Sequence, residues 1–153
     1  MNEIQYIQKH GANKALYPAY GRLTDQLQED GFTGDLDALI RLISACEMVD
    51  LLGGYEEAKK EFAEQLNADK PYPNETENNK RILLDYRRAN NIFEMDDYII
   101  HDGELKVFAM WSTAIEGCAY IGYAYAEDGE MAENDEFRHA TDEEITAGRR
   151  LDQ

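Results

Sequence analysis

The sequence predicts an α+β fold: an N-terminal helical part packed on a C-terminal antiparallel β-meander of three to four strands, followed by a short terminal helix. Three observations predict it. In the first half, apolar residues recur at three- and four-residue steps, the period of a helix. From Tyr98 to Tyr125 they alternate at the strand period around turn-forming pairs. Near the C-terminus, TDEEITAGRR carries residues that begin and end a helix.

Two short helices are expected first. Residues 3–16 have apolar side chains at helical spacing, and Gly11 interrupts the pattern. Residues 20–30 repeat this spacing and stop at Gly31, because glycine readily takes the left-handed conformation that ends a helix.

The clearest helix follows Asp35, a residue typical of an N-cap. Its apolar stripe is wide, which predicts a central helix buried on one face, and Gly53 and Gly54 end it. A further helix is expected over 55–67. The stripe consists of Leu36, Leu39, Ile40, Ile43, Cys46, Val49 and Leu52.

The stretch 69–75, DKPYPNE, holds two of the three prolines and is the main break in the chain. We expect Thr76 to cap the next helix, which the pair Asn90-Asn91 closes. The break is too short to separate domains, so a single domain over 1–153 is predicted. It comprises a helical part (1–68), the proline-containing connection (69–75), and a helix plus antiparallel sheet (76–153).

The meander begins with a hairpin, because Asp102-Gly103 is a strong two-residue turn sequence between apolar strands. Glu116-Gly117 indicates the next reversal, and 118–125 the third strand. The strands are apolar on both faces. Such a sheet is either covered on both sides or presents one face to a partner.

Residues 127–136, EDGEMAENDE, hold six acids and no base, which is typical of an exposed loop or hairpin tip. Residues 137–139 are a candidate fourth strand. Thr141 is expected to cap the last helix in a capping box with Glu144, and Gly148 to end it.

The chain is strongly acidic, with 32 acids against 15 bases, a formal charge of −17 and a pI near 4.4. Such a chain repels nucleic acid and acidic membranes and is attracted to basic surfaces. Solubility alone is the other explanation of the charge. The sequence has neither an apolar run of membrane-spanning length nor an apolar signal core at its start, which predicts a cytoplasmic location.

Motifs for catalysis and cofactor binding are missing. The sequence contains no phosphate-binding glycine loop and no GxSxG, and its three histidines fit no zinc motif. Cys46 and Cys118 fit reduced, packed thiols. We therefore predict no catalytic, cofactor-binding or metal-binding residue and no cofactor, and a non-enzymatic protein is favoured.

A protein-binding surface is favoured instead, because tyrosines cluster beside acids in the second half, and a tyrosine's apolar ring and polar tip suit interfaces. The predicted partner-binding residues are Asp96, Asp97, Tyr98, Asp102, Glu104, Tyr120, Tyr123, Tyr125, Glu127, Asp128, Glu130, Glu133, Asp135 and Glu136.

The segment EFRHATDEEITAGRRLD, 136–152, resembles a tail found in small accessory proteins of phages and other mobile elements. The resemblance implies a phage or plasmid context and, with it, the host cytoplasm. Small acidic proteins of such genomes often inhibit host defence nucleases by imitating DNA or blocking nucleic-acid grooves.

The leading hypothesis is an acidic, non-enzymatic interaction protein that occupies a basic, nucleic-acid-binding surface of a partner protein, without binding nucleic acid or membrane itself. The alternative is a small-ligand-binding or enzymatic domain with a pocket between the sheet and the Leu36–Leu52 helix. A structural component that forms a homo-oligomer is a third hypothesis.

Overall fold

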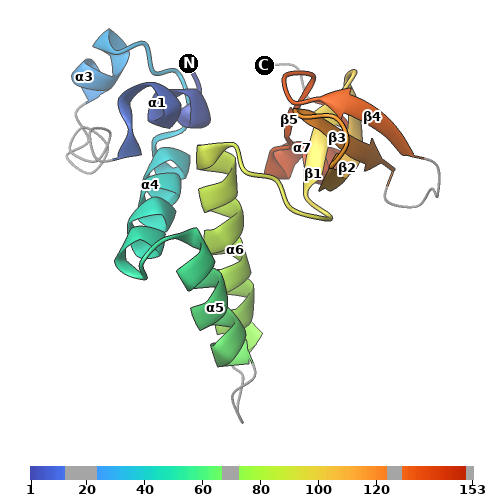
Figure 1. Ribbon diagram of the computed structural model, residues 1–153. Helices are drawn as coiled ribbons and strands as arrows, with labels where there is room; N and C mark the ends of the chain where they lie inside the picture. The colour runs from blue at the N-terminus through green and yellow to red at the C-terminus, as the bar shows by residue number, and fades with distance from the viewer. Residues whose placement is uncertain (13–23, 67–72, 124–128, 151–153) are drawn as a thin grey trace. The chain divides into compact units, whose positions relative to one another are not determined.

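The computed structural model describes residues 1–12, 24–66, 73–123 and 129–150 (Figure 1). It has helices in the first half, an antiparallel sheet in the second and a short terminal helix, which confirms the α+β class. The chain forms two compact units, Met1–Ile92 and Phe93–Gln153, called here the helical unit and the sheet unit. Each is described by itself.

The helical unit begins with two short helices, and the last and longest of its helices lies alongside the two before it (Figure 1). The predicted break at Gly11 is confirmed, since Gly11 ends the first helix with a positive φ of 81°. The expected 20–30 helix lies partly outside the described residues. The helices are α1 (Glu3–His10), α3 (Thr24–Glu29), α4 (Leu36–Leu51), α5 (Tyr55–Leu66) and α6 (Pro73–Asn90).

Helix α4 is central to this unit, as its stripe predicted. The Asp35 side chain accepts hydrogen bonds from the backbone N–H groups of Asp37 and Ala38, so the predicted N-cap is confirmed. Leu39 and Ile43 are fully buried within the core of the unit. An ion pair also joins α4 to α6, with 3.4 Å between Arg41 Nε and the buried Asp85 Oδ2.

The expected start of α6 is wrong, because the helix begins at Pro73 and Thr76 lies inside it. Proline is well suited to the first turn of a helix, where its missing N–H is not needed and its φ is already helical. Helix α6 contacts α4 and α5, so it belongs to the helical unit. The boundary between the two compact units therefore lies between Ile92 and Phe93 and not at 69–75. The single domain over 1–153 stays a prediction.

The sheet unit is a five-stranded antiparallel sheet of order β4-β3-β2-β1-β5. The predicted hairpin is confirmed: Asp102 and Gly103 both have positive φ, 51° and 76°, as a type I′ turn requires. The elements are β1 (Tyr98–His101), β2 (Glu104–Trp111), β3 (Cys118–Gly122), β4 (Gly129–Glu133), β5 (Phe137–His139) and α7 (Asp142–Ala147).

The acidic run 127–136 is not simply a loop, since it contains β4. Residues of β4 pair with β3 from Cys118↔Glu133 to Gly122↔Gly129, and Ala132 is buried. Pairing to the free edge of β3 outweighs the low strand preference of glycine and glutamate, because strand formation depends mainly on cross-strand context. The candidate strand 137–139 is confirmed as β5.

The two faces of the sheet differ. The core face carries the buried apolar cluster of the unit, including Phe93, Ile99, Phe108, Ile121 and Phe137. The outer face carries the residues that alternate with them along the strands. The sheet therefore has its own core.

Helix α7 begins and ends as predicted. Thr141 and Glu144 form the capping box, and Gly148 ends the helix in the left-handed conformation. The buried Glu144 carboxylate also accepts two hydrogen bonds from Arg138, at 2.7 and 2.9 Å. Arg138 and Glu144 thus attach α7 to β5. Across the described ranges, no helix has both the length and the apolarity to cross a membrane.

Candidate functional site on the sheet unit

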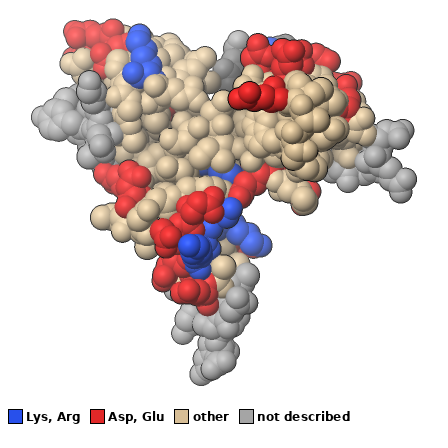
Figure 2. Space-filling view, in the orientation of Figure 1, with Lys and Arg blue, Asp and Glu red and all other residues tan. Residues whose placement is uncertain are grey.

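Most of the protein's net negative charge lies in the sheet unit. Phe93–Gln153 holds sixteen Asp and Glu against four Lys and Arg, a net −12 of the chain's −17. In Figure 2 the part of the sheet unit in view is mostly red and tan, whereas blue lies beside red over α5 and α6. Two of the four bases, Lys106 and Arg138, form ion pairs inside the unit, with Glu130 and Glu144. The surface of this unit is therefore strongly acidic.

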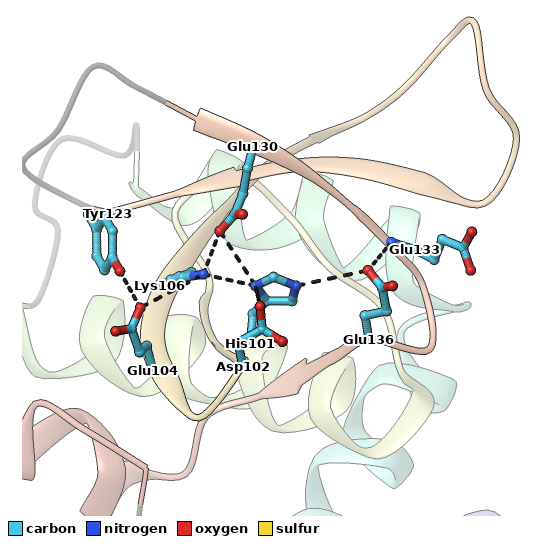
Figure 3. A network of polar contacts seen from close by, with 8 residues as sticks. All are labelled: His101, Asp102, Glu104, Lys106, Tyr123, Glu130, Glu133 and Glu136. Carbon is cyan, nitrogen blue, oxygen red and sulfur yellow. Dashed lines mark hydrogen bonds and ion pairs between the residues drawn. The ribbon is translucent and has the colours of Figure 1, made fainter.

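A buried pair of nitrogen-bearing side chains lies at one end of the core face (Figure 3). His101 on β1 and Lys106 on β2 are each only 5% exposed, and Lys106 Nζ lies 2.9 Å from His101 Nδ1. An ammonium group can only donate, so Lys106 is the donor in this contact. The other ring nitrogen of His101, Nε2, faces Glu136 Oε2 at 3.9 Å.

The curl of the sheet brings acids from distant strands to this pair. Strands β1 and β4 are separated by β2 and β3, about 14 Å in a flat sheet. Yet Glu130 Oε1 on β4 lies 3.5 Å from His101 Nδ1 and 2.5 Å from Lys106 Nζ. We call the four carboxylates within 4.0 Å of His101 or Lys106 the carboxylate rim, namely Asp102, Glu104, Glu130 and Glu136.

The rim is held in place by its contacts. The hydrogen bond from Lys106 lowers the pKa of the Glu130 carboxyl below its ordinary value, so Glu130 is charged at neutral pH. The Tyr123 hydroxyl donates to Glu104, and the Tyr123 ring lies 5.7 Å from Lys106 Nζ. Rim side chains are about half exposed or more, with 49% for Glu130 and 80% for Asp102. A partner can therefore reach all four carboxylates, and hydrogen bonds position three of them, those of Glu104, Glu130 and Glu136.

The outer face carries an exposed apolar row over β2, β3 and β4. Met110 pairs with Tyr120, and Tyr120 pairs with Met131, so the three side chains are direct cross-strand neighbours. They are 50%, 42% and 41% exposed. A register shift between Phe108 and Met110 places Met110 opposite Tyr120. We call Met110, Tyr120 and Met131 the methionine–tyrosine row.

The structure distributes the predicted partner-binding residues over several places. Asp102, Glu104, Glu130 and Glu136 form the rim, and Tyr123 contacts it. Tyr98, Tyr120 and Glu133 lie on the outer face, and the Glu133 carboxylate points away from the rim (Figure 3). Asp96 and Asp135 are exposed in turns. Tyr125, Glu127 and Asp128 lie outside the described residues.

Asp97 differs from the other acids in this set. It is buried, and its carboxylate accepts a hydrogen bond of 2.9 Å from the backbone N–H of Glu94. This bond closes the turn before β1, so the side chain supports the fold and does not face a partner.

Sequence reasoning missed Lys106, His101 and the two methionines. One pattern could have revealed Lys106, because it alternates with Phe108 along β2 and is the only base of that strand. A base on the core side of a strand implies buried acids nearby, since buried charges are paired. Met110 could not be identified, because its side of β2 depends on the register shift. Met131 could not be identified, because it lies on β4, which is a strand only through its pairing with β3.

A catalytic or metal centre is not apparent in the site. His101 lies beside Glu104 at one end of β2, whereas Cys118 lies beside Ser112 at the other end, so these two side chains do not meet. Within the described parts of the chain, no group of three or more His, Cys, Asp or Glu is placed to hold a metal ion. The basic side chains within the described network are His101 and Lys106, and both already form contacts there.

A cleft of about 410 Å³ lies beside the first half of β2. Its walls include the rings of Tyr98 and Tyr123, the apolar Leu105, and the charged Glu104 and Arg149. A pocket between the sheet and α4 remains a prediction, because this cleft is formed within the sheet unit alone. Comparisons with protein-family models, curated proteins and solved structures found no match.

Proposed function

We propose that the protein is a non-enzymatic, acidic interaction protein that binds a basic, nucleic-acid-binding surface of a partner protein through its sheet unit. In the mobile-element context implied by the C-terminal tail, its role is that of an anti-defence inhibitor, which excludes nucleic acid from the partner's groove. The proposal assigns no catalytic step and no cofactor.

The observation that carries the proposal is the carboxylate rim. Four acids from the β1–β2 turn, β2, β4 and the turn before β5 are gathered around two buried side chains and remain exposed to solvent. Acids whose role is solubility need no fixed arrangement, and they normally lie apart because like charges repel. Fixed, clustered carboxylates resemble the closely spaced phosphates that a basic groove binds.

The partner is expected to be a protein and not a nucleic acid. A net charge of −12 on the sheet unit repels phosphates, whose binding requires Lys and Arg to release counterions. The same charge attracts a basic groove from a distance and accelerates encounter at low salt.

The test compares two variants of equal charge. In the rim variant, D102N/E104Q/E130Q/E136Q replaces the four carboxylates with amides of nearly the same shape. In the control, E56Q/E57Q/E61Q/E64Q removes four exposed acids from α5. Each protein is immobilised and exposed to host lysate at low and at high salt, and the captured proteins are identified by mass spectrometry.

We expect the wild type and the α5 variant to capture nucleic-acid-binding proteins at low salt, and the rim variant to lose them. Capture should weaken at high salt, which screens exposed charges. The proposal is wrong if the captured set lacks nucleic-acid-binding proteins, if capture is indifferent to salt, or if the rim and α5 variants behave alike.

A second candidate, a small-ligand-binding domain, is favoured only by the cleft beside β2, whose volume of about 410 Å³ is that of a small-ligand site. Thermal-shift screening with nucleotides, sugars and metal ions tests it. A stabilisation by several degrees with one ligand, lost in Tyr98→Ala, would establish this candidate.

A further inference from the structure

A pocket of about 500 Å³ lies in the helical unit, and all of its lining residues belong to that unit. Its volume is in the range of small-ligand sites. Helix α1 contacts both α4 and α6, and the pocket is formed by the C-terminal ends of these three helices. Part of the lining is apolar and buried, namely Ile7, Cys46 and Ala89. The pocket can therefore cover the apolar part of a ligand.

The three helix ends give the pocket a negative potential. The lining residues Gln8 and Gly11 come from the end of α1, and Asp50 comes from the last turn of α4. Asn90 and Asn91 come from the end of α6. Each helix end carries a partial negative charge, because its last carbonyl groups have no partner within the helix. Their convergence favours a positively charged ligand.

The Asp50 carboxylate adds a full negative charge. Among the described residues that line the pocket, Asp50 is the one acid and none is a base. Asp50 is exposed and forms no ion pair with a described residue. A carboxylate in the last turn of a helix opposes the helix dipole and lowers stability. An acid that costs stability at the mouth of a pocket is typical of a binding residue.

The helix ends do carry bases, but none of these lines the pocket. In the last turn of α6, Arg87 donates a hydrogen bond to the Tyr55 hydroxyl. Its neighbour Arg88 lies 4.0 Å from the buried Asp85 carboxylate. The negative potential of the pocket is therefore not neutralised from within its own lining.

Neutral polar groups lie around the carboxylate. Tyr86 stacks on Tyr55 with 5.5 Å between the ring centroids, which orients its ring. Burial raises the pKa of the Tyr86 hydroxyl, and the nearby Asp50 carboxylate raises it further, so the hydroxyl stays protonated at neutral pH. Asn90 Nδ2 donates to the Tyr86 carbonyl oxygen at 2.9 Å and lies 3.9 Å from Cys46 Sγ. The amide oxygen of Asn90 can therefore accept a hydrogen bond from a ligand.

We propose that this pocket binds a small organic cation, an amine or guanidine with an apolar body. Its positive group lies against the Asp50 carboxylate and donates to the Asn90 amide oxygen, and its apolar body covers Ile7 and Ala89. An anion would meet three negative helix ends and no base. A bare metal ion would leave the apolar lining uncovered. The inference concerns the helical unit and does not rest on the proposed function.

The test titrates the intact protein with benzylamine and phenylguanidine, and with benzyl alcohol and benzoate as the neutral and anionic counterparts of benzylamine. Calorimetry measures affinity, and two-dimensional NMR follows the side-chain amide signals of Gln8, Asn90 and Asn91, which report on the pocket. The variants are Asp50→Asn, which keeps the shape, and Asp37→Asn, a control of equal charge. Asp37 is exposed in the first turn of the same helix and does not line the pocket.

We expect one-to-one binding of at least one of the two cations, with shifts of the three amide signals, and no measurable binding of benzyl alcohol or benzoate. Asp50→Asn should weaken binding about tenfold or more, because hydrogen bonds to a charged group are the stronger ones. Without ligand, Asp50→Asn should unfold at the same temperature as the wild type or higher, because it removes the charge that opposes the helix dipole. Asp37→Asn should bind like the wild type.

Several results would overturn the inference. These are no binding of either cation, equal or tighter binding of benzyl alcohol or benzoate, and undiminished binding by Asp50→Asn. Binding that the rim variant D102N/E104Q/E130Q/E136Q loses would place the cation on the sheet unit instead. Amide shifts with a lysine-containing peptide but with neither free cation would assign the pocket to a partner's side chain. None of these results bears on capture through the rim, so the two proposals fail separately.

Discussion

Lys106 contributes both to the stability of the sheet unit and to the candidate site. It stabilises the end of the sheet, and it positions the carboxylates above it. Its ammonium donates to His101 on β1 and to Glu130 on β4, two strands that are not neighbours. A buried charge is tolerated only when such partners are present. Lys106 is thus a positioning residue for the rim.

Lys106→Met should lower the free energy of unfolding by about 1–3 kcal/mol, since the buried Nδ1 of His101 loses its donor. Glu130→Gln should cost about 1 kcal/mol or less, because Glu130 is half exposed and water replaces the lost contact. Urea unfolding of both variants measures the difference. A larger loss for Glu130→Gln would contradict this assignment.

The same bond predicts a pH dependence. The pKa of Glu130 is lowered in the folded protein, so its contribution to stability is complete above the ordinary value of 4.5 and is lost as pH falls through the lower, folded value. The stability difference between the wild type and Glu130→Gln should therefore shrink below pH 4.5. Urea midpoints at pH values on both sides of this point test it. A difference that grows on acidification would contradict the sign.

Cys46 should be chemically inert in the folded protein. Burial raises the pKa of its thiol to about 11, so the reactive thiolate is scarce at neutral pH. Iodoacetamide followed by mass spectrometry should modify Cys118, which is partly exposed, well before Cys46. Unfolding in urea should make the two cysteines react at similar rates. Early modification of Cys46 in the native protein would show that its pocket opens.

Among single residues, those with a local role could be predicted from the sequence. Asp35, Thr141 and Gly148 cap helices through contacts within a few positions, and each was identified. Lys106 and His101 could not be paired in advance with Glu130, because that contact depends on the curl of the whole sheet.

At the level of elements, the β1–β2 hairpin follows directly from its turn sequence. Gly103 has a φ of 76°, and a Cβ placed there would meet no other atom within 4 Å. A substitution at this position therefore acts through backbone conformation alone.

Gly103→Ala should destabilise the protein by about 1–2 kcal/mol, because alanine disfavours the left-handed region. Gly103→Asn should cost less, since asparagine tolerates that region. Thermal unfolding of the two variants distinguishes a backbone effect from a steric one. Equal losses would mean that the space around the turn matters more than its φ.

Two elements show where prediction from sequence ends. The start of α6 at Pro73 differs from the predicted cap at Thr76, because proline suits the first turn of a helix and allows it to begin three positions earlier. Strand β4 was missed because its composition is that of a loop, and only the free edge of β3 makes it a strand.

The molecule as a whole divides its charge unequally. The helical unit carries a net −5 and the sheet unit a net −12, although the helical unit has more residues. The total charge of the chain could be calculated from the sequence. The net charge of each unit could be calculated only after the structure had shown that the boundary follows Ile92. The gathering of four acids into one rim required the fold itself.

The most direct test of binding through the rim is the salt dependence of affinity for a nucleic-acid-binding protein that the wild type captures from lysate. Log affinity is measured against log salt concentration for the wild type, the rim variant and the α5 variant. We expect the rim variant to lose affinity at low salt and to have a shallower slope, because it forms fewer charge contacts with the groove. The α5 variant should match the wild type. Equal slopes for the rim and α5 variants would contradict the claim that the rim is the binding surface.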